Sequence, residues 1–232
     1  MLKLAQRQQL IFSLAIKYLL QRCCQYTLSG EQCARDALII ITENKDKWTD
    51  IYNLLSHSIR QTITCQNCKN ESHTFKEQLY SEVWCPEDAV SLKTFLEKTF
   101  NKGEIIIEYL CDACNVRGEA TQSFQPVTEV SSSYFMVQLT RNMDNYSNRV
   151  VATEDINLLD SNGCPRTFTP IRIIHHRGGV EYNMNTVRHY MCDIRSHLDK
   201  KWYFTSDATA IRPVQEEDVS NKCFIVLYKR KN

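Results

Sequence analysis

The chain has 232 residues, which is enough for one large domain or two small ones and for a substantial buried core. Hydrophobic residues make up 43% and charged residues 24%, values that exclude collagen-like, low-complexity and intrinsically disordered proteins. Lys and Arg number 28 against 27 Asp and Glu, a net charge of +1, so no bulk charge favours nucleic acid or an anionic membrane as a partner. Glycines number only 6, and the sequence has no Gly-rich phosphate-binding loop.

The first residues predict a helix rather than an export signal. Residues 10–20 place apolar side chains at helical spacing, and Lys17 interrupts the apolar run, which fits an amphipathic helix better than a signal peptide. No apolar run is long enough for a membrane span. The chain has 11 cysteines, an odd number, which favours metal ligands, core residues or a nucleophile over a disulfide framework. We therefore expect a cytoplasmic or nuclear protein without a membrane partner.

The first quarter of the chain is predicted to be helical, to about residue 59. A second helix is expected over residues 34–42, because Ser29 and Gln32 have the spacing of a capping box just before it. Residues 48–58 fit a third helical or mixed segment. The pattern changes after residue 59, where short cysteine pairs begin.

The remainder of the chain predicts mostly strands. A helix is expected over residues 90–100, and a β-branched run at 105–107 indicates a strand. Further strands are predicted at residues 134–140, 149–157, 170–175, 189–194, 201–205 and 223–228. A helical start followed by a β-rich end predicts an α+β fold.

Two C-x-x-C motifs give the strongest spacing signal in the sequence. Cys65 and Cys68 form the first motif, and Cys111 and Cys114 form the second. Two residues between thiolates allow a tight turn to direct both sulfurs at one ion, and two such turns complete the Cys₄ shell of a structural zinc. The alternative is that the pairs arise by chance or form redox couples. A closed four-sulfur shell has no open position for catalysis, so we expect a structural zinc.

The segment around His189 has a layout that acid–base chemistry can use. His189 begins one predicted strand, and Ser206 and Asp207 end the next, so a second side chain could orient the imidazole. From the residues alone this signal is weak, because a histidine beside a tyrosine is more often structural than catalytic.

The order of the motifs carries a family resemblance. After the cysteine pairs come F-M-V-Q-L-T-R at 135–141, I-H-H-R-G at 174–178, R-H-Y at 188–190, W-Y-F-T-S-D at 202–207 and F-I-V-L-Y at 224–228. The segment G-E-Q-C-A-R-D-A-L at 30–38 is similar to a Gln-rich helix that precedes them. From about residue 25 to the end, this order resembles the ubiquitin-specific protease family.

The resemblance implies one domain over residues 1–232 with a papain-like cysteine protease fold shaped as a hand. Residues 1–59 would be a helical remnant of the thumb, residues 60–133 the fingers with a zinc ribbon, and residues 134–232 a β-rich palm. The implied partners are ubiquitin or ubiquitinated proteins, held between fingers and palm.

The resemblance also assigns roles to single residues. His189 matches the family's catalytic histidine, Ser206 the residue that orients it, and Asp207 the acidic residue that follows. Arg188 stands where the family has glycine, which adds bulk and charge beside the channel for the ubiquitin tail.

The family's nucleophile segment, Asn-x-Gly-Asn-Thr-Cys, has no counterpart in this sequence. Cys33, near a predicted helix start, fits a packing role better than a nucleophilic one. Two functions therefore stay open: a deubiquitinase that cleaves isopeptide bonds at the ubiquitin C-terminus, and a non-catalytic ubiquitin-binding pseudoprotease module. A zinc-ribbon adaptor for nucleic acid is a third, which the charge balance disfavours. His57, His73 and His197 are expected at the surface.

Overall fold

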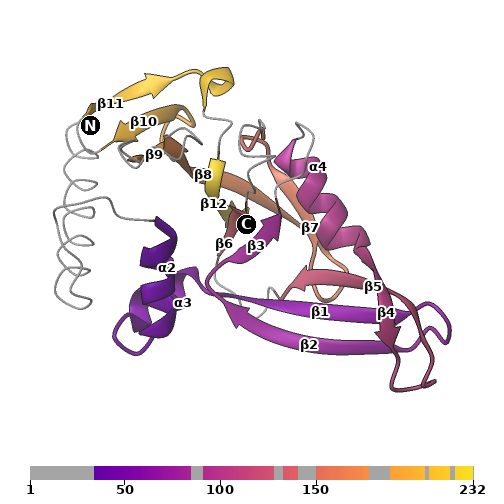
Figure 1. Ribbon diagram of the computed structural model, residues 1–232. Coiled ribbons are helices and arrows are strands. Elements are labelled where there is room, and N and C mark those ends of the chain that lie inside the picture. Colours follow the sequence, from indigo (N-terminus) through magenta and orange to yellow (C-terminus); the bar gives the residue numbers. More distant parts are fainter. Residues whose placement is uncertain are drawn as a thin grey trace, which may run out of the picture.

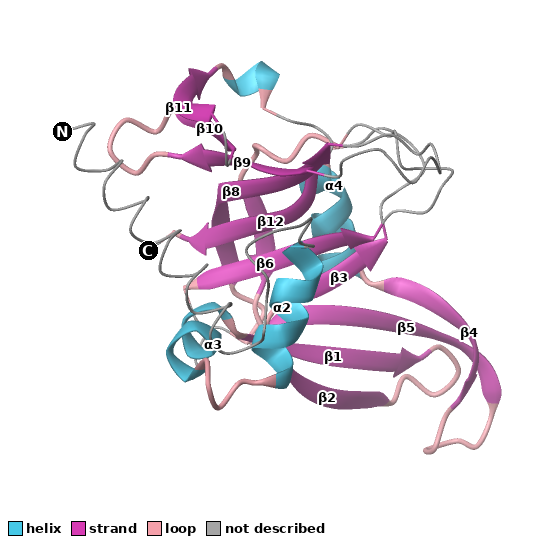
Figure 2. Ribbon diagram, turned by 60° about the vertical axis from the view of Figure 1, so that its left-hand side comes forward, coloured by secondary structure: helices cyan, strands magenta, loops and turns pink. Residues whose placement is uncertain are grey.

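The computed structural model describes residues 34–84, 91–127, 133–140, 150–177, 189–206, 209–219 and 223–231. These residues form a four-stranded sheet and an eight-stranded sheet, and Figures 1 and 2 show the smaller sheet below the larger one. The predicted helix at residues 10–20 lies outside the described residues, as does Cys33. None of the helices in these ranges is long and apolar enough to cross a membrane.

Two short helices precede the first strand. Helix α2 spans Ala34–Glu43, where a helix was predicted, and α3 spans Thr49–Leu55. Their apolar side chains pack against one face of the larger sheet in a cluster of Leu38, Ile41, Trp48, Tyr52, Leu79, Met136 and Ile225. The helical prediction up to residue 59 is wrong, because strand β1 (His57–Cys65) begins there. Its alternating buried and half-buried residues, several of them β-branched, favour a pleated strand over a helix.

The four-stranded sheet, called here the finger sheet, has the order β2-β1-β5-β4 and is antiparallel throughout. Strand β2 spans Glu71–Gln78, β4 spans Glu104–Leu110 and β5 spans Arg117–Pro126. Strand β4 contains the β-branched run that predicted it. Strands β2 and β5 were not predicted, because β2 is exposed along nearly its whole length and β5 is rich in polar residues.

Helix α4 (Leu92–Glu97) packs where the two sheets meet and continues as a π-helix over Lys98–Lys102. The Ser91 hydroxyl caps its start by accepting from the Thr94 N–H. The prediction of a helix over 90–100 is confirmed. Gly103 ends it with φ +77, and a Cβ there would lie 2.5 Å from the carbonyl oxygen of Gln122. Glycine is therefore required for β4 to turn onto β5.

The larger sheet, called here the palm sheet, has the order β11-β10-β9-β8-β12-β6-β3, with β7 paired to β8. Its strands are β3 (Ser81–Trp84), β6 (Tyr134–Thr140), β7 (Ile156–Leu159), β8 (Pro165–Arg177), β9 (His189–Arg195), β10 (Trp202–Ser206), β11 (Thr209–Val214) and β12 (Cys223–Arg230). Only β3 and β6 run parallel. The strand predicted at 149–157 is instead an isolated bridge at Val151 followed by β7.

The main core lies between the palm sheet and α4. It contains Leu92 and Leu96 of α4 with Phe135, Val137 and Tyr228 of the sheet, all with at most 1% exposed surface. The Phe135 ring contacts further rings edge-on, at centroid distances of 4.9 Å to His57 and 5.5 Å to Phe100. Burial of each large apolar side chain stabilises the fold by roughly 1.5–3 kcal/mol. This core fixes the junction between finger and palm sheets.

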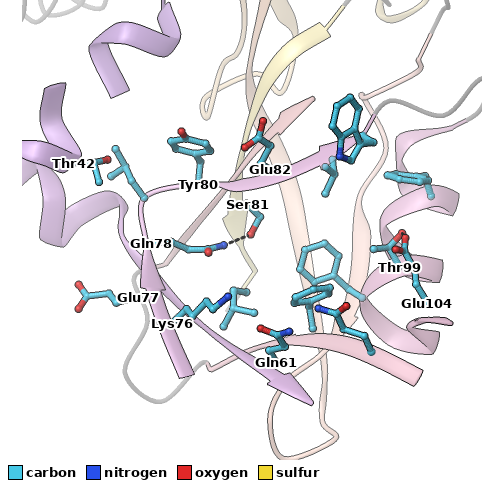
Figure 3. Close-up of a pocket in the computed structure, with 18 of the residues that line it drawn as sticks. Thr42, Gln61, Lys76, Glu77, Gln78, Tyr80, Ser81, Glu82, Thr99 and Glu104 are labelled. Atoms are coloured by element: carbon cyan, nitrogen blue, oxygen red, sulfur yellow. Dashed lines mark hydrogen bonds between the residues drawn. The ribbon is translucent and has the colours of Figure 1, made fainter. Parts of the chain in front are cut away.

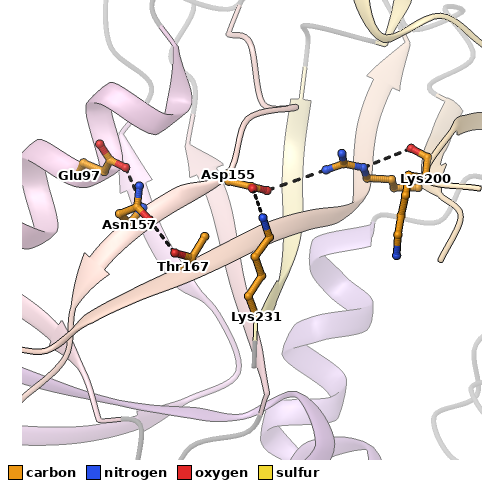
Figure 4. A network of polar contacts seen from close by, with 7 residues as sticks. Glu97, Asp155, Asn157, Thr167, Lys200 and Lys231 are labelled. Carbon is orange, nitrogen blue, oxygen red and sulfur yellow. Dashed lines mark hydrogen bonds and ion pairs between the residues drawn. The ribbon is translucent and has the colours of Figure 1, made fainter.

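Polar side-chain contacts hold strand β7 and the chain just after β12 in place (Figure 4). The Glu97 carboxylate accepts from the Asn157 N–H at 2.7 Å, and the carbonyl oxygen of the Asn157 side chain accepts from the Thr167 hydroxyl at 2.8 Å. Lys231 pairs with Asp155 at 2.5 Å just after β12 ends. A side chain from α4 thus satisfies a backbone group of β7, and the ion pair connects the chain after β12 to Asp155, just before β7.

Candidate functional site

The four cysteines of the C-x-x-C motifs meet at the far end of the finger sheet. Their sulfur atoms all lie within 4.8 Å of one another, as the prediction of one cluster requires. Each motif makes the same turn: the residue after its second cysteine, Lys69 or Asn115, has φ of 60° or 54° and donates its N–H to the first cysteine's carbonyl. Each turn directs two sulfurs toward the same point, so the four cysteines form a possible metal site.

The thiols of the cluster differ in how easily they lose a proton. Backbone N–H groups from its own turn lower the pKa of Cys65, and a hydrogen bond from the Asn67 amide lowers the pKa of Cys114 to about 7. At Cys68 the backbone N–H of Asn70 acts in the same direction, but desolvation and bonds to three neighbouring thiols outweigh it and raise the pKa to about 12. A bound divalent cation would stabilise all four groups as thiolates, so the residues fit a tetrahedral metal site.

A groove of about 880 Å³ lies where α2, the finger sheet, β3 and α4 meet (Figure 3). Its floor is apolar and includes Ile59, Leu79, Val83, Phe95, Phe100 and Phe124. Its rim is polar and includes Gln61, Lys76, Glu77, Gln78, Glu82, Glu104 and Gln122. Trp84 extends the apolar surface at one end and is 68% exposed. Three of the four charged residues named on this rim are acidic, so the groove suits a protein surface that combines apolar and basic side chains.

The strands bring the predicted His189 and Ser206 to one end of the palm sheet. His189 begins β9 and pairs with Arg177 of β8, while Ser206 ends β10. Strands β9 and β10 are antiparallel, and Thr205 lies opposite Cys192, so the start of β9 adjoins the end of β10. The pairing of the two side chains stays a prediction. Asp207 and Arg188 lie outside the described residues.

A buried histidine–aspartate pair lies beside this end of the sheet and was not predicted. His175 Nε2 of β8 is 3.3 Å from Asp193 Oδ2 of β9, and the side chains are 6% and 2% exposed. The His175 ring also lies 6.2 Å from the ring of Phe204 on β10. No spacing rule connects residues 18 apart on two strands, so only the sheet register reveals the pair. The pair joins β8 to β9, the strand that begins with His189.

Three described cysteines lie outside the cluster, and they differ in exposure. Burial raises the pKa of the Cys192 thiol to about 12, although the nearby Arg172 guanidinium acts in the opposite direction. Cys223 is fully buried, and its sulfur faces the Val150 carbonyl at 3.8 Å. Cys164 is exposed in the turn between β7 and β8. All seven cysteines in these ranges are free thiols.

Comparison with known proteins finds the fold but no close relative. No family model and no curated protein matches the sequence. Among solved structures, the SAGA Ubp8/Sgf11/Sus1/Sgf73 DUB module bound to ubiquitin aldehyde superposes with a TM-score of 0.67 at 15% identity, over 92% of this chain and 52% of that one. The chain has the fold of a ubiquitin-specific protease domain.

Two further structures agree. A SAGA DUB module with a substituted Ubp8, bound to monoubiquitin, has a TM-score of 0.67 at 16% identity, over 92% of this chain and 52% of that chain. The yeast SAGA DUB module with a mutant Sgf73 has a TM-score of 0.60 at 17% identity, over 98% and 50% respectively. The chain thus spans about half the length of the solved chains it matches. The resemblance predicted from the motif order is confirmed for the fold.

Proposed function

We propose that this chain binds ubiquitin through the groove between the finger sheet, β3 and α2, as part of a ubiquitin carboxyl-terminal hydrolase. The observation that carries the proposal is the groove itself, which lies in a protease-type fold whose solved neighbours include complexes with ubiquitin aldehyde and monoubiquitin. Ubiquitin or a ubiquitinated protein is therefore the proposed partner, and the proposal includes no nucleic-acid partner.

The shape and charge of the groove support a protein ligand. Its volume and open form suit a convex protein surface better than a small molecule enclosed on all sides. Trp84 offers a large exposed aromatic surface of the kind that dominates binding energy at interfaces. Glu77 and Glu82 on the rim would attract basic side chains around the ligand's apolar patch.

The hydrolytic form of the proposal uses the corner formed by β9 and β10. A cysteine thiolate would attack the carbonyl carbon of the last ubiquitin glycine, His189 would accept the thiol proton and return it to the leaving amine, and water would then release the acyl group. Ser206 and Asp207 would orient the imidazole. The buried His175–Asp193 pair supports this role because it fixes the register of β8 and β9 beside His189.

A second function, ubiquitin binding without hydrolysis, has its own support. Cys192, the described cysteine nearest to His189 along β9, is half-buried, and desolvation raises its pKa, which is the opposite of what a nucleophile needs. Cys223 is fully buried. A ubiquitin-binding pseudoprotease would keep the groove and the finger sheet and would not need a reactive thiol.

Zinc would be held by Cys65, Cys68, Cys111 and Cys114 and would supply a structural link rather than chemistry. It would hold β1 and β2 against β4 and β5, so the finger side of the groove keeps its shape. Free thiols and a thiolate metal site are stable in a reducing compartment, which agrees with a cytoplasmic or nuclear location.

Calorimetric titration of the zinc-loaded chain with ubiquitin tests the shared part of the proposal. We expect saturable binding that the Trp84→Ala substitution weakens by at least about tenfold, in line with loss of an interface aromatic. Leu198→Ala is the matched control, because Leu198 is 63% exposed in the turn between β9 and β10 and outside the groove. Failure to bind ubiquitin, or equal weakening by both substitutions, would contradict the proposal.

Ubiquitin with an electrophile in place of its C-terminal carboxylate distinguishes the two functions. A covalent adduct that is lost in His189→Ala identifies the hydrolase. Binding of this probe without adduct formation identifies the non-catalytic module.

A further inference from the structure

We propose that the outer edge of strand β4 docks a second protein, which adds a short β-strand with basic residues flanking an apolar centre. This surface consists of Glu104, Ile105, Ile106, Ile107 and Glu108 and is called here the β4 edge. The proposal does not depend on ubiquitin binding.

The β4 edge is open and unusually apolar. In the described part of the chain β4 pairs only with β5, so alternate backbone N–H and C=O groups face outward. Ile105 is 68% exposed and Ile107 is 74% exposed, although isoleucine is among the residues most often buried. Leu110, 47% exposed, extends the apolar surface toward the cysteine cluster. Such exposure on one edge indicates an interaction site rather than scattered surface residues.

The opposite edge of the same sheet provides an internal comparison. Strand β2 has the sequence E-S-H-T-F-K-E-Q, in which Phe75 is the sole apolar residue and charged side chains stand on both sides of it. Charged residues, lysine above all, are the usual protection of an edge strand against pairing with another chain. Strand β4, with the sequence E-I-I-I-E-Y-L, has neither lysine nor proline. The two edge strands therefore differ in protection against pairing, and β4 lacks the lysine that β2 carries.

Charge decides what kind of strand fits the β4 edge. A second copy of this chain pairing antiparallel about Ile106 would bring Glu104 close to Glu108 of the other copy at both ends of the paired segment, and like charges that face each other across two strands destabilise the pair. A heterologous strand with lysine or arginine at these two positions would form two opposite-charge pairs and would cover Ile105 and Ile107 with apolar side chains. The expected partner pattern is basic–apolar–any–apolar–basic.

The β4 edge is separate from the main part of the groove. Ile105 and Ile107 do not line the groove, while Glu104 lies at its boundary. A strand added outside β4 would extend the finger sheet to five strands without covering Ile59, Val83 or Trp84. The β-bulge between Ile106 and Tyr109, with Glu108 at φ 58, limits regular pairing to a short segment. A partner would accordingly contribute a strand of only a few residues.

NMR titration of the isotope-labelled, zinc-loaded full chain with two synthetic peptides tests the proposal. The first is acetyl-GKVTVKG-amide, which has the expected pattern, and the second is acetyl-GEVTVEG-amide, which differs only in charge. We expect the basic peptide to shift the backbone amide signals of residues 104–108 in a saturable manner. The acidic peptide should bind at least about tenfold more weakly, since each opposite-charge pair becomes a like-charge pair.

Substitutions at exposed positions provide controls that keep the fold. Ile105→Ser with Ile107→Ser should abolish saturable binding of the basic peptide, whereas Phe75→Ser on β2 should leave it unchanged. Absence of binding, shifts centred on β2, or equal binding of both peptides would overturn the proposal. Self-association of the unliganded chain through residues 104–108 would overturn it in favour of a second copy as the occupant.

Discussion

Protonation of His57 is predicted to weaken the fold at mildly acidic pH. His57 begins β1 at the junction of the two sheets, where it is 2% exposed, and its Nε2 lies 3.1 Å from the Ser81 hydroxyl of β3. Its ring packs edge-on against Phe135 at 4.9 Å. Burial lowers the pKa of His57 to about 4 from the usual 6.5, and the nearby Leu55 backbone offsets only part of this shift. The folded chain therefore holds this histidine neutral.

The sign and size of the effect follow from this shift. As pH falls below 6.5, the unfolded chain binds a proton at His57 that the folded chain does not, so stability is lost until pH approaches 4. One pKa unit corresponds to about 1.36 kcal/mol, so the contribution of His57 to the loss is about 2 kcal/mol at pH 5 and approaches about 3 kcal/mol below pH 4. Such a loss is a large fraction of the stability of a typical domain.

Urea unfolding of the zinc-loaded chain at pH 7.5 and pH 5 measures this contribution. The natural chain should lose about 2 kcal/mol more between these values than His57→Gln, which cannot titrate. His73→Gln, at a histidine whose side chain is 41% exposed on β2, should behave like the natural chain. The reasoning is refuted if the natural chain and His57→Gln show the same pH dependence, or if acid stabilises the natural chain relative to this variant.

Three other perturbations have defined outcomes. Chelation of zinc, or the substitution Cys114→Ser, should unfold the finger sheet before the palm sheet, because structural zinc contributes on the order of 10 kcal/mol. Hydrogen exchange should reveal this order of unfolding. The control Cys164→Ser should exchange like the natural chain. Asn101→Ala removes bonds to the backbone of Asn157 and Leu159 and should cost about 1–2 kcal/mol in chemical unfolding; an unchanged midpoint would contradict this. Asp160→Ala removes the buried acceptor of two backbone N–H groups and of Arg166, so thermal unfolding should show a loss of at least about 2 kcal/mol, and a smaller loss would argue against its role.

The sequence predicted those parts of the fold that depend on local patterns. The C-x-x-C spacing identified all four members of the sulfur cluster, and β-branched runs identified most strands of the palm sheet. Helix α4 was predicted because its apolar residues repeat at helical spacing. In each case neighbouring residues along the chain contain the whole physical signal.

The remaining features depend on contacts between distant residues. Strand β2 is exposed on both faces, so its sequence has no alternation that could reveal it. His57 was expected at the surface, which is wrong, because β3 and Phe135 cover it only after the two sheets meet. The groove and the His175–Asp193 pair likewise form from several strands and helices. Neither the groove nor the pair produces a recognisable spacing of residues in the sequence.

Site-specific photo-crosslinking tests most directly whether the groove binds ubiquitin. Benzoylphenylalanine in place of Trp84, within the groove, is predicted to form a covalent crosslink to added ubiquitin on irradiation. The same residue in place of Leu198, which is similarly exposed outside the groove, is predicted to form none. A crosslink from position 198 and none from position 84 would contradict the proposed ubiquitin site.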